Sequence, residues 1–175
     1  MIAAATAMVG CGDGAEDQSE SLGETYGTLF ESFSATDIYG GTQNEDLILG
    51  SRYTLVLIWS TTCNPCIEGM PKMEALYQEY KNIGVNVLGI VVNLQDQEGN
   101  PIPETIADAV SITEAKGVTF PNIMIPAPIM DFLYSEIQYT PTAFFVDETG
   151  TIVGDLVIGE QEYGDWSDAI EELID

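Results

Sequence analysis

The apolar and polar positions of this chain change their spacing several times, and each change marks the boundary of a predicted strand or helix. TLVLIWS at 54–60 is a short, continuous apolar run, which is typical of a strand buried on both faces. The next segment, 63–82, is predicted to be an amphipathic helix, because its apolar side chains recur at helical spacing: Met70, Met73, Leu76, Tyr77 and Tyr80. Gly84 ends this helix, and VNVLGIVV at 85–92 is a second buried strand. Strand, helix and strand of these lengths predict a right-handed βαβ unit.

Shorter elements are predicted downstream of this unit. A polar loop at 94–104 leads into a helix over 104–116, which Gly117 ends. NIMI at 122–125 is a short apolar piece between two prolines. IMDFLYSEI at 129–137 is predicted to be a brief helix.

Hairpin patterns lie on either side of these elements. TAFFVDETGTIVGDLVIG at 142–159 alternates and turns at Glu148-Thr149-Gly150, which predicts two antiparallel strands. FSATDIYGGTQNEDLIL at 33–49 fits a small hairpin that turns at Gly40-Gly41. The last segment, 165–175, is predicted to be a helix with one apolar face that packs on the sheet: Trp166, Ala169, Ile170, Leu173 and Ile174. This pattern predicts a layered α/β fold.

Composition narrows the classes of function. The 175 residues, 45% of them hydrophobic, suit one domain with one core. The 29 acidic residues against 4 basic ones give a formal charge of −25, which excludes nucleic acid as a partner because phosphates would be repelled. The chain has no histidine, so imidazole base catalysis, Cys-His nucleophile pairs and the commonest metal ligand are excluded.

The first residues have the character of a processing segment. Met8-Val9-Gly10-Cys11 resembles the lipobox of bacterial lipoproteins, in which the cysteine is lipid-modified and becomes the new N-terminus. On this interpretation 1–11 is a truncated signal segment, 12–30 is an acidic flexible tether, and 31–175 is the folded domain. A lipid on Cys11 would anchor the protein to the outer face of a bacterial membrane. The alternative is a free cysteine on a frayed tail.

The chain places two of its three cysteines in one short motif, WSTTCNPC at 59–66. Cys63 falls just after the first buried strand, and Pro65 falls in the first turn of the helix, where its missing N–H costs nothing. A thiolate at a helix N-terminus is stabilised by unpaired N–H groups and by the helix dipole, so Cys63 is predicted to be a nucleophile. Cys66, one turn further in, is predicted to resolve the mixed disulfide that Cys63 forms.

WSTTCNPC at the end of a strand, with Tyr139-Thr140-Pro141-Thr142 further on, resembles the thioredoxin superfamily. FSATDIYGG, the GMP that follows the cysteines, FPN and YTPTAFFVDETGTIVG are most similar to the TlpA/ResA group of extracytoplasmic thiol:disulfide oxidoreductases. The similarity covers about 33–174. It implies a thioredoxin-like three-layer fold, with a central mixed β-sheet flanked by helices and an N-terminal β-hairpin extension. It also implies that the Cys63-Cys66 disulfide is the redox centre and that no other cofactor is used.

The resemblance assigns further roles. Pro141 would have a cis peptide bond and lie against the dithiol, and the backbone of Thr140 would pair with the substrate. On the residues alone, Pro141 could also be a proline that begins a strand. Supporting active-site positions are Trp59, Asn64 and Pro65. The implied partners are protein disulfide or dithiol substrates and a membrane electron donor, and the protein would act as a reductant in an extracytoplasmic compartment.

Three positions depart from the family pattern. Gly69 stands where the family often has a Glu, three residues after the second cysteine. Leu57 stands where cytoplasmic thioredoxins have a buried Asp that helps to move the proton of the resolving thiol. No acidic residue stands at the position of the second-strand Glu that some members of the family place near the dithiol, unless Gln95 or Asp96 approaches it. The proton acceptor for Cys66 therefore stays unassigned at this point.

The motif has three other interpretations. A peroxiredoxin-like peroxidase fits Ser60 but would require a proline at Val56 and an arginine in the site, whereas Arg52 lies before the strand. A redox-inert binding lipoprotein could keep the fold and the disulfide, although a ring across two intervening residues adds little loop-closure entropy. A zinc site needs about four ligands, and beyond the motif only Cys11 is left to supply a thiolate.

Overall fold

Five strands form the central sheet: β3 (Tyr53–Trp59), β4 (Val85–Val91), β5 (Asn122–Met124), β6 (Thr142–Asp147) and β7 (Ile152–Ile158). The computed structural model describes residues 22–175 of the chain. The strand order is β5-β4-β3-β6-β7. β3 and β4 pair in parallel, as do β4 and β5, whereas β6 pairs antiparallel with both β3 and β7. The sheet is therefore mixed, and both the predicted βαβ unit and the predicted hairpin are confirmed.

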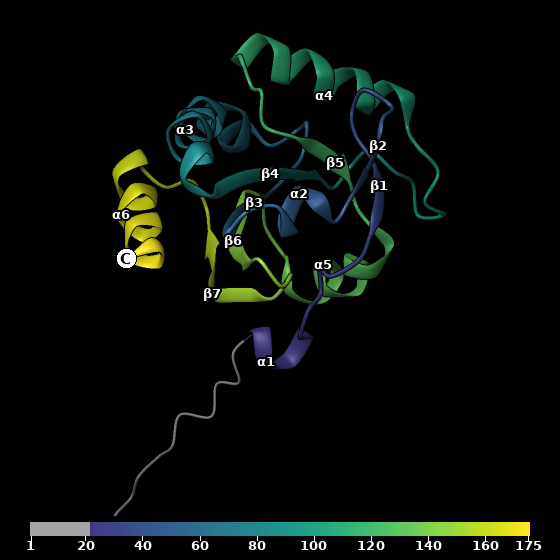
Figure 1. The fold of residues 1–175 in the computed structure, drawn as a ribbon. Coiled ribbons are helices and arrows are strands. Elements are labelled where there is room, and N and C mark those ends of the chain that lie inside the picture. The colour runs from purple at the N-terminus through teal and green to yellow at the C-terminus, as the bar shows by residue number, and fades with distance from the viewer. Residues whose placement is uncertain (1–21) are drawn as a thin grey trace, which may run out of the picture.

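Helices cover both faces of this sheet, which gives the three expected layers (Figure 1). One face carries α3 (Asn64–Tyr80), α4 (Pro103–Lys116) and α6 (Tyr163–Ile174). The other face carries α1 (Leu22–Tyr26), α2 (Asp46–Leu49) and α5 (Met130–Glu136). A short 3₁₀ turn at Lys81–Ile83 follows α3, and another at Ala127–Ile129 precedes α5.

The two faces of β3 explain why its sequence is apolar at every position from Leu55 to Trp59. Leu55, Leu57 and Trp59 belong to the cluster under α3, α4 and α6, whereas Val56 and Ile58 belong to the cluster under α5. All five are buried. Successive side chains of a strand point to opposite faces, so a central strand between two helical layers buries both sets.

The front of the domain differs from the prediction in two places. A hairpin is present, with β1 (Ser34–Thr36) antiparallel to β2 (Thr42–Asn44), but it is shorter than 33–49 because Asp46–Leu49 form α2. The turn between the strands is closed by Asp37, whose Oδ1 accepts hydrogen bonds from the backbone N–H groups of Tyr39 (2.9 Å) and Gly41 (2.8 Å).

The folded part also begins earlier than residue 31. Phe30 is completely buried, its backbone N–H donates to the carbonyl of Gly150 (3.0 Å), and its ring lies 6.1 Å from that of Phe144. Together with α1, this segment belongs to the domain and not to a tether. The predicted signal segment 1–11, its Cys11 and most of the proposed tether lie outside the described residues. No helix within 22–175 is long and apolar enough to cross a membrane.

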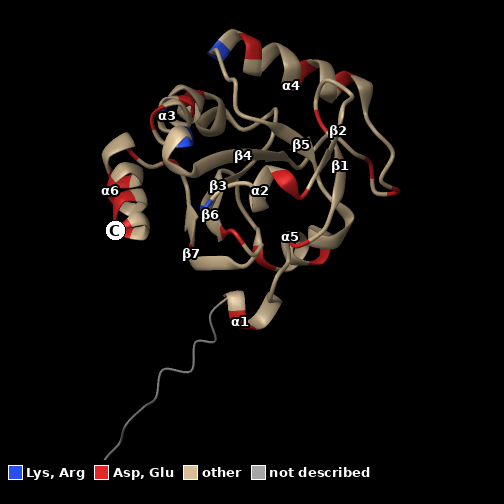
Figure 2. Ribbon diagram, in the orientation of Figure 1, with Lys and Arg blue, Asp and Glu red and all other residues tan. Residues whose placement is uncertain are grey.

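Acidic residues lie on helices of both layers and on several loops, and basic residues are few (Figure 2). Arg52 donates to the carbonyl of Ile174 (2.8 Å), which ties the start of β3 to the end of α6. Lys72 makes ion pairs with Glu160 (2.8 Å) and Glu162 (3.3 Å).

Candidate active site

The turn from β3 into α3 holds the two cysteines in a disulfide whose Cα atoms are 5.3 Å apart. Cys63 is the N-cap of α3: its Sγ accepts a hydrogen bond from the N–H of Cys66 (3.3 Å), and its carbonyl accepts from Ile67 (3.1 Å). Cys63 is 9% exposed and Cys66 is 2% exposed. The predicted geometry at the helix start is thus present, and Cys63 is the outer sulfur.

The loop that follows β4 is hydrogen-bonded to the residues just before Cys63. The side chain of Asn93, two residues after β4, accepts from the N–H of Thr61 (3.1 Å) and donates to its hydroxyl (2.8 Å). Asn93 is not among the site residues predicted from the sequence. Because parallel strands end at the same edge of a sheet, a polar residue just after the second apolar run was the available signal.

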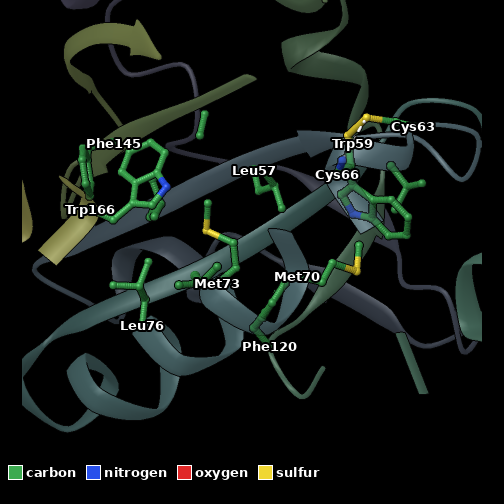
Figure 3. Close-up of a cluster of buried hydrophobic side chains, with 14 of the residues drawn as sticks. Leu57, Trp59, Cys63, Cys66, Met70, Met73, Leu76, Phe120, Phe145 and Trp166 are labelled. Atoms are coloured by element: carbon green, nitrogen blue, oxygen red, sulfur yellow. Dashed lines mark hydrogen bonds between the residues drawn. A yellow bond between two sulfur atoms is a disulfide. The ribbon is translucent and has the colours of Figure 1, made fainter. Parts of the chain in front are cut away.

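Trp59 lies under the disulfide and is completely buried (Figure 3). Its Nε1–H donates to Oδ1 of Asn122 (2.9 Å), the Asn of the FPN stretch. Gly89 makes room for this contact, because a Cβ there would lie 1.9 Å from Asn122 Oδ1 and 3.0 Å from Trp59 Nε1. Trp59 is therefore held from behind by the neighbouring strands. Asn64 and Pro65, in contrast, are exposed in the first turn of α3.

The Thr140-Pro141 peptide bond is cis, as the resemblance implied. Pro141 is buried, and its carbonyl accepts from the N–H of Gly159 (2.8 Å), while the Thr142 hydroxyl donates to the carbonyl of Tyr139 (2.7 Å). Pro141 lines the same small cavity as Cys66. The structure thus brings the two distant motifs together.

This small cavity, which we call the closed cavity because its volume is only about 20 Å³, lies between the start of α3, β3, β6 and the loop before α6, and Lys72 and Glu160 at its edge are partly exposed. Leu57, Met73 and Trp166 contribute apolar walls, and the close-up shows all three on the same side of β3 as the disulfide (Figure 3). Its charged members are Lys72 and Glu160, which are paired. The hydrogen bond with Glu160, together with the one to Glu162, raises the pKa of Lys72.

A wider open groove begins at the residues that precede Pro141. It has a volume of about 310 Å³, and its rim includes Tyr134 and Tyr139, which are 71% and 65% exposed. Thr140 lines it as well. An adjoining hollow of about 120 Å³ shares Tyr134 and is lined by Asp96 and Glu98.

Neither of the two residues considered as proton acceptors lies in the closed cavity. Gln95 accepts a hydrogen bond from the N–H of Ile125 (3.1 Å). Asp96 binds its own loop, and hydrogen bonds from the side chain and backbone of Asn100 lower its pKa. Leu57 lines the closed cavity and supplies no acceptor.

The structural features expected of a peroxidase do not meet at the cysteines. Arg52, the only arginine of the chain, lies before β3, at the opposite end of the strand from Cys63. Val56 faces the cluster under α5. Within 22–175 no group of three or more Cys, Asp or Glu side chains could hold a metal ion.

The mixed sheet, the disulfide at the start of α3 and the cis-proline beside it define a thioredoxin-like protein. The chain belongs to the AhpC/TSA family, whose sequence profile matches residues 26–154.

Individual relatives narrow this class. The thiol-disulfide oxidoreductase ResA of Bacillus thuringiensis is 29% identical over 138 residues, which cover 74% of this chain and 68% of that protein. Among solved structures, a thiol:disulfide interchange protein of Chlorobium tepidum superposes with a TM-score of 0.66 at 20% identity, covering 83% of this chain and 94% of its own. StoA of Bacillus subtilis has a TM-score of 0.58 at 19% identity, covering 82% and 96%. The resemblance to the TlpA/ResA group is confirmed.

Proposed function

We propose that this protein is a thiol:disulfide oxidoreductase that exchanges disulfides with other proteins through Cys63 and Cys66, and that it acts as a reductant. The observation that carries the proposal is the disulfide at the N-terminus of α3, with Cys63 the more exposed sulfur. In the reduced protein, the thiolate of Cys63 would face the unpaired N–H groups and positive dipole end of α3.

The reaction proceeds in two displacements. The Cys63 thiolate attacks a client disulfide, forms a mixed disulfide and releases one client sulfur as a thiolate. Cys66 then loses its proton and attacks Cys63, which forms the Cys63-Cys66 bond and releases the second client sulfur. The client disulfide gains two electrons and the pair in this protein loses two. A donor dithiol must then restore the reduced pair.

The surroundings of the disulfide suit a protein client. Thr140, just before the buried Pro141, lines the open groove, and we assign its backbone to pairing with an extended client segment. Trp59 supports the dithiol from beneath, and Asn64 and Pro65 form the exposed edge that a client meets. The exposed tyrosines of the groove would contact residues that flank the client cysteine.

Location is the second part of the proposal. The lipobox-like sequence that ends at Cys11 supports a lipid anchor on this cysteine, which would hold the domain at the outer face of the cytoplasmic membrane through a short acidic tether. An extracytoplasmic reductant has no cytoplasmic thiol pool beside it, so its electrons would come from a membrane protein. Metabolic labelling with a fatty acid in wild type and in Cys11→Ala tests the anchor: unlabelled wild-type protein would refute it.

Two cysteine variants test the chemistry. Cys63→Ser should abolish reduction of insulin disulfides, because Cys66, the other thiol within residues 22–175, is only 2% exposed. Cys66→Ser should retain the first displacement and accumulate a covalent adduct with the client, visible as a band that thiols remove. Full activity in Cys63→Ser would refute the assignment of the nucleophile.

The direction of transfer is tested by the reduction potential of the Cys63-Cys66 pair, measured in glutathione or dithiothreitol buffers. A reductant should lie below a glutathione poise of about −220 to −260 mV, and each 30 mV corresponds to roughly 1.4 kcal/mol. A potential near about −120 mV, in the range of strong oxidants, would reverse the assigned direction.

A further inference from the structure

The second displacement requires a group that accepts the proton of Cys66. Cys66 is 2% exposed, and a thiol must lose its proton before it becomes an effective nucleophile. Water has poor access to this sulfur, so the proton must pass to a nearby group. Leu57, Gln95 and Asp96 do not provide one, as described above.

The carboxylate of Glu160, from the loop before α6, lies over the face of α3 that carries Cys66 and Gly69. A Cβ at Gly69 would lie 3.5 Å from Cγ and 3.6 Å from Oε1 of Glu160. Residues three apart on a helix share a face, with Cβ atoms about 5–6 Å apart, so this carboxylate is one helical turn from Cys66. A long side chain at position 69 would take the space that Glu160 occupies.

The closed cavity joins these two groups. Cys66, Gly69 and Glu160 all line it, and its volume of about 20 Å³ suits one water molecule. Trp166 also lines it, is 3% exposed, and its Nε1–H has no hydrogen-bond partner within 22–175. A buried indole N–H without a partner is unusual, and a water in this cavity would satisfy it.

We propose that Glu160 is the proton acceptor for Cys66, through one water molecule held by Trp166 in the closed cavity. The proposal rests on the proposed function, because it concerns the second displacement. The Cys66 proton passes through the water to the Glu160 carboxylate, the sulfur attacks Cys63, and the client sulfur leaves as a thiolate. The proton on Glu160 is then returned to solvent or to the departing client thiolate.

Lys72 fixes the acceptor in place. Its Nζ is 2.8 Å from Glu160 and 3.3 Å from Glu162, so one cation joins both carboxylates. Glu162 has a side chain that is 80% exposed and does not line the closed cavity, whereas the Glu160 side chain is 32% exposed. Lys72 of α3 makes the ion pair with Glu160, Cys66 is the titratable group that lines the same cavity, and Glu162 is joined to Glu160 through Lys72. Glu162 therefore provides a matched control with the same charge and the same cation.

The test follows one turnover of the reduced protein with a disulfide peptide, using acid quenching and mass spectrometry to measure the mixed disulfide at Cys63 between pH 5 and 9. In Glu160→Gln the mixed disulfide should form at the wild-type rate and decay about 10–100-fold more slowly at pH 6, with the deficit shrinking as pH rises. Glu162→Gln should decay as wild type does. Unfolding curves in urea show whether each variant is folded.

Three outcomes test separately the role of Glu160, the role of the water and the proposed function. Wild-type decay and an unchanged pH profile in Glu160→Gln would overturn the proposal. Trp166→Phe keeps an aromatic wall but removes the N–H, so it should also slow decay, and wild-type decay there would overturn the role of the water held by Trp166. If no mixed disulfide forms at Cys63 in the wild-type protein, the proposed function fails instead.

Discussion

The two sides of Pro141 differ in the volume of the adjoining cavity and in the exposure of its lining residues. Behind it, the closed cavity has a volume of about 20 Å³ and is lined by apolar side chains, by Cys66 and by the Lys72-Glu160 ion pair. In front of it, the open groove holds about 310 Å³ with two tyrosines exposed on its rim. One side excludes solvent from the inner sulfur, and the other offers a surface to a second protein. We infer that proton transfer and client recognition are separated by this one residue.

The charge distribution sharpens the contrast. The closed cavity has one basic and one acidic residue in its lining, Lys72 and Glu160, in a chain of formal charge −25; Glu162, the second partner of Lys72, does not line it. The hollow beside the open groove has Asp96 and Glu98 and no cation in its lining. The field of the whole protein is therefore felt by a client at the groove more than by Cys66.

The largest expected difference concerns stability. Trp166→Ala removes a buried indole that packs edge-on against Phe145, with ring centroids 6.1 Å apart, and should cost about 3–5 kcal/mol of unfolding free energy. Tyr134→Ala, on the open side, should change it by less than about 0.5 kcal/mol. Urea unfolding measures both, and equal losses would remove the distinction between the two sides.

Recognition should show the reverse sensitivity. The double variant Tyr134→Ala, Tyr139→Ala should lower kcat/KM for a protein client by about tenfold, equivalent to roughly 1.4 kcal/mol, because the exposed rings of the groove are lost. Oxidised glutathione is too small to fill the groove, so its rate should not change. A parallel loss with glutathione would mean that the tyrosines act on the dithiol itself.

A smaller effect concerns the attachment of α6, which carries Trp166. Tyr163 donates a hydrogen bond to Glu79 of α3, and this bond raises the pKa of Tyr163 to about 12. The raised pKa means that the bond stabilises the fold fully below pH 10, the ordinary value, and loses this contribution as the pH rises towards 12.

Tyr163→Phe should accordingly lower stability at pH 8 by roughly 1 kcal/mol. The difference between the variant and wild type should disappear between about pH 10 and 12, following the shifted pKa. Unfolding curves at several pH values measure it. A difference that persists unchanged at pH 12 would show that the phenol contributes by packing alone.

The smallest effect is electrostatic. Two disulfide peptides that differ only in Lys or Glu beside the cysteine should be reduced at rates that differ by roughly threefold at low salt, the Lys peptide faster. At about 1 M salt, where the screening length falls to about 3 Å, the two rates should converge. Faster reduction of the Glu peptide would contradict an acidic client-binding surface on this protein.

Much of the local structure could be predicted from the sequence. The continuous apolar run predicted the central strand, and the prolines and glycines marked most element ends, because these rules act within a few residues. Predictions failed where tertiary contacts override local pattern: α2 replaces the end of the second arm of the front hairpin, and Phe30 is buried in the core beside Phe144.

The sequence by itself determined that two cysteines stand at the start of a helix, since a strand, a turn and Pro65 are encoded in adjacent residues. Tertiary structure alone decided what surrounds them. Trp59 meets Asn122 across 63 positions, and Glu160 reaches Gly69 from a loop near the end of the chain. These contacts depend on strand order and on the paths of the loops, which local propensities do not specify. The carboxylate nearest to the Cys66 helix face therefore became visible only in the folded chain.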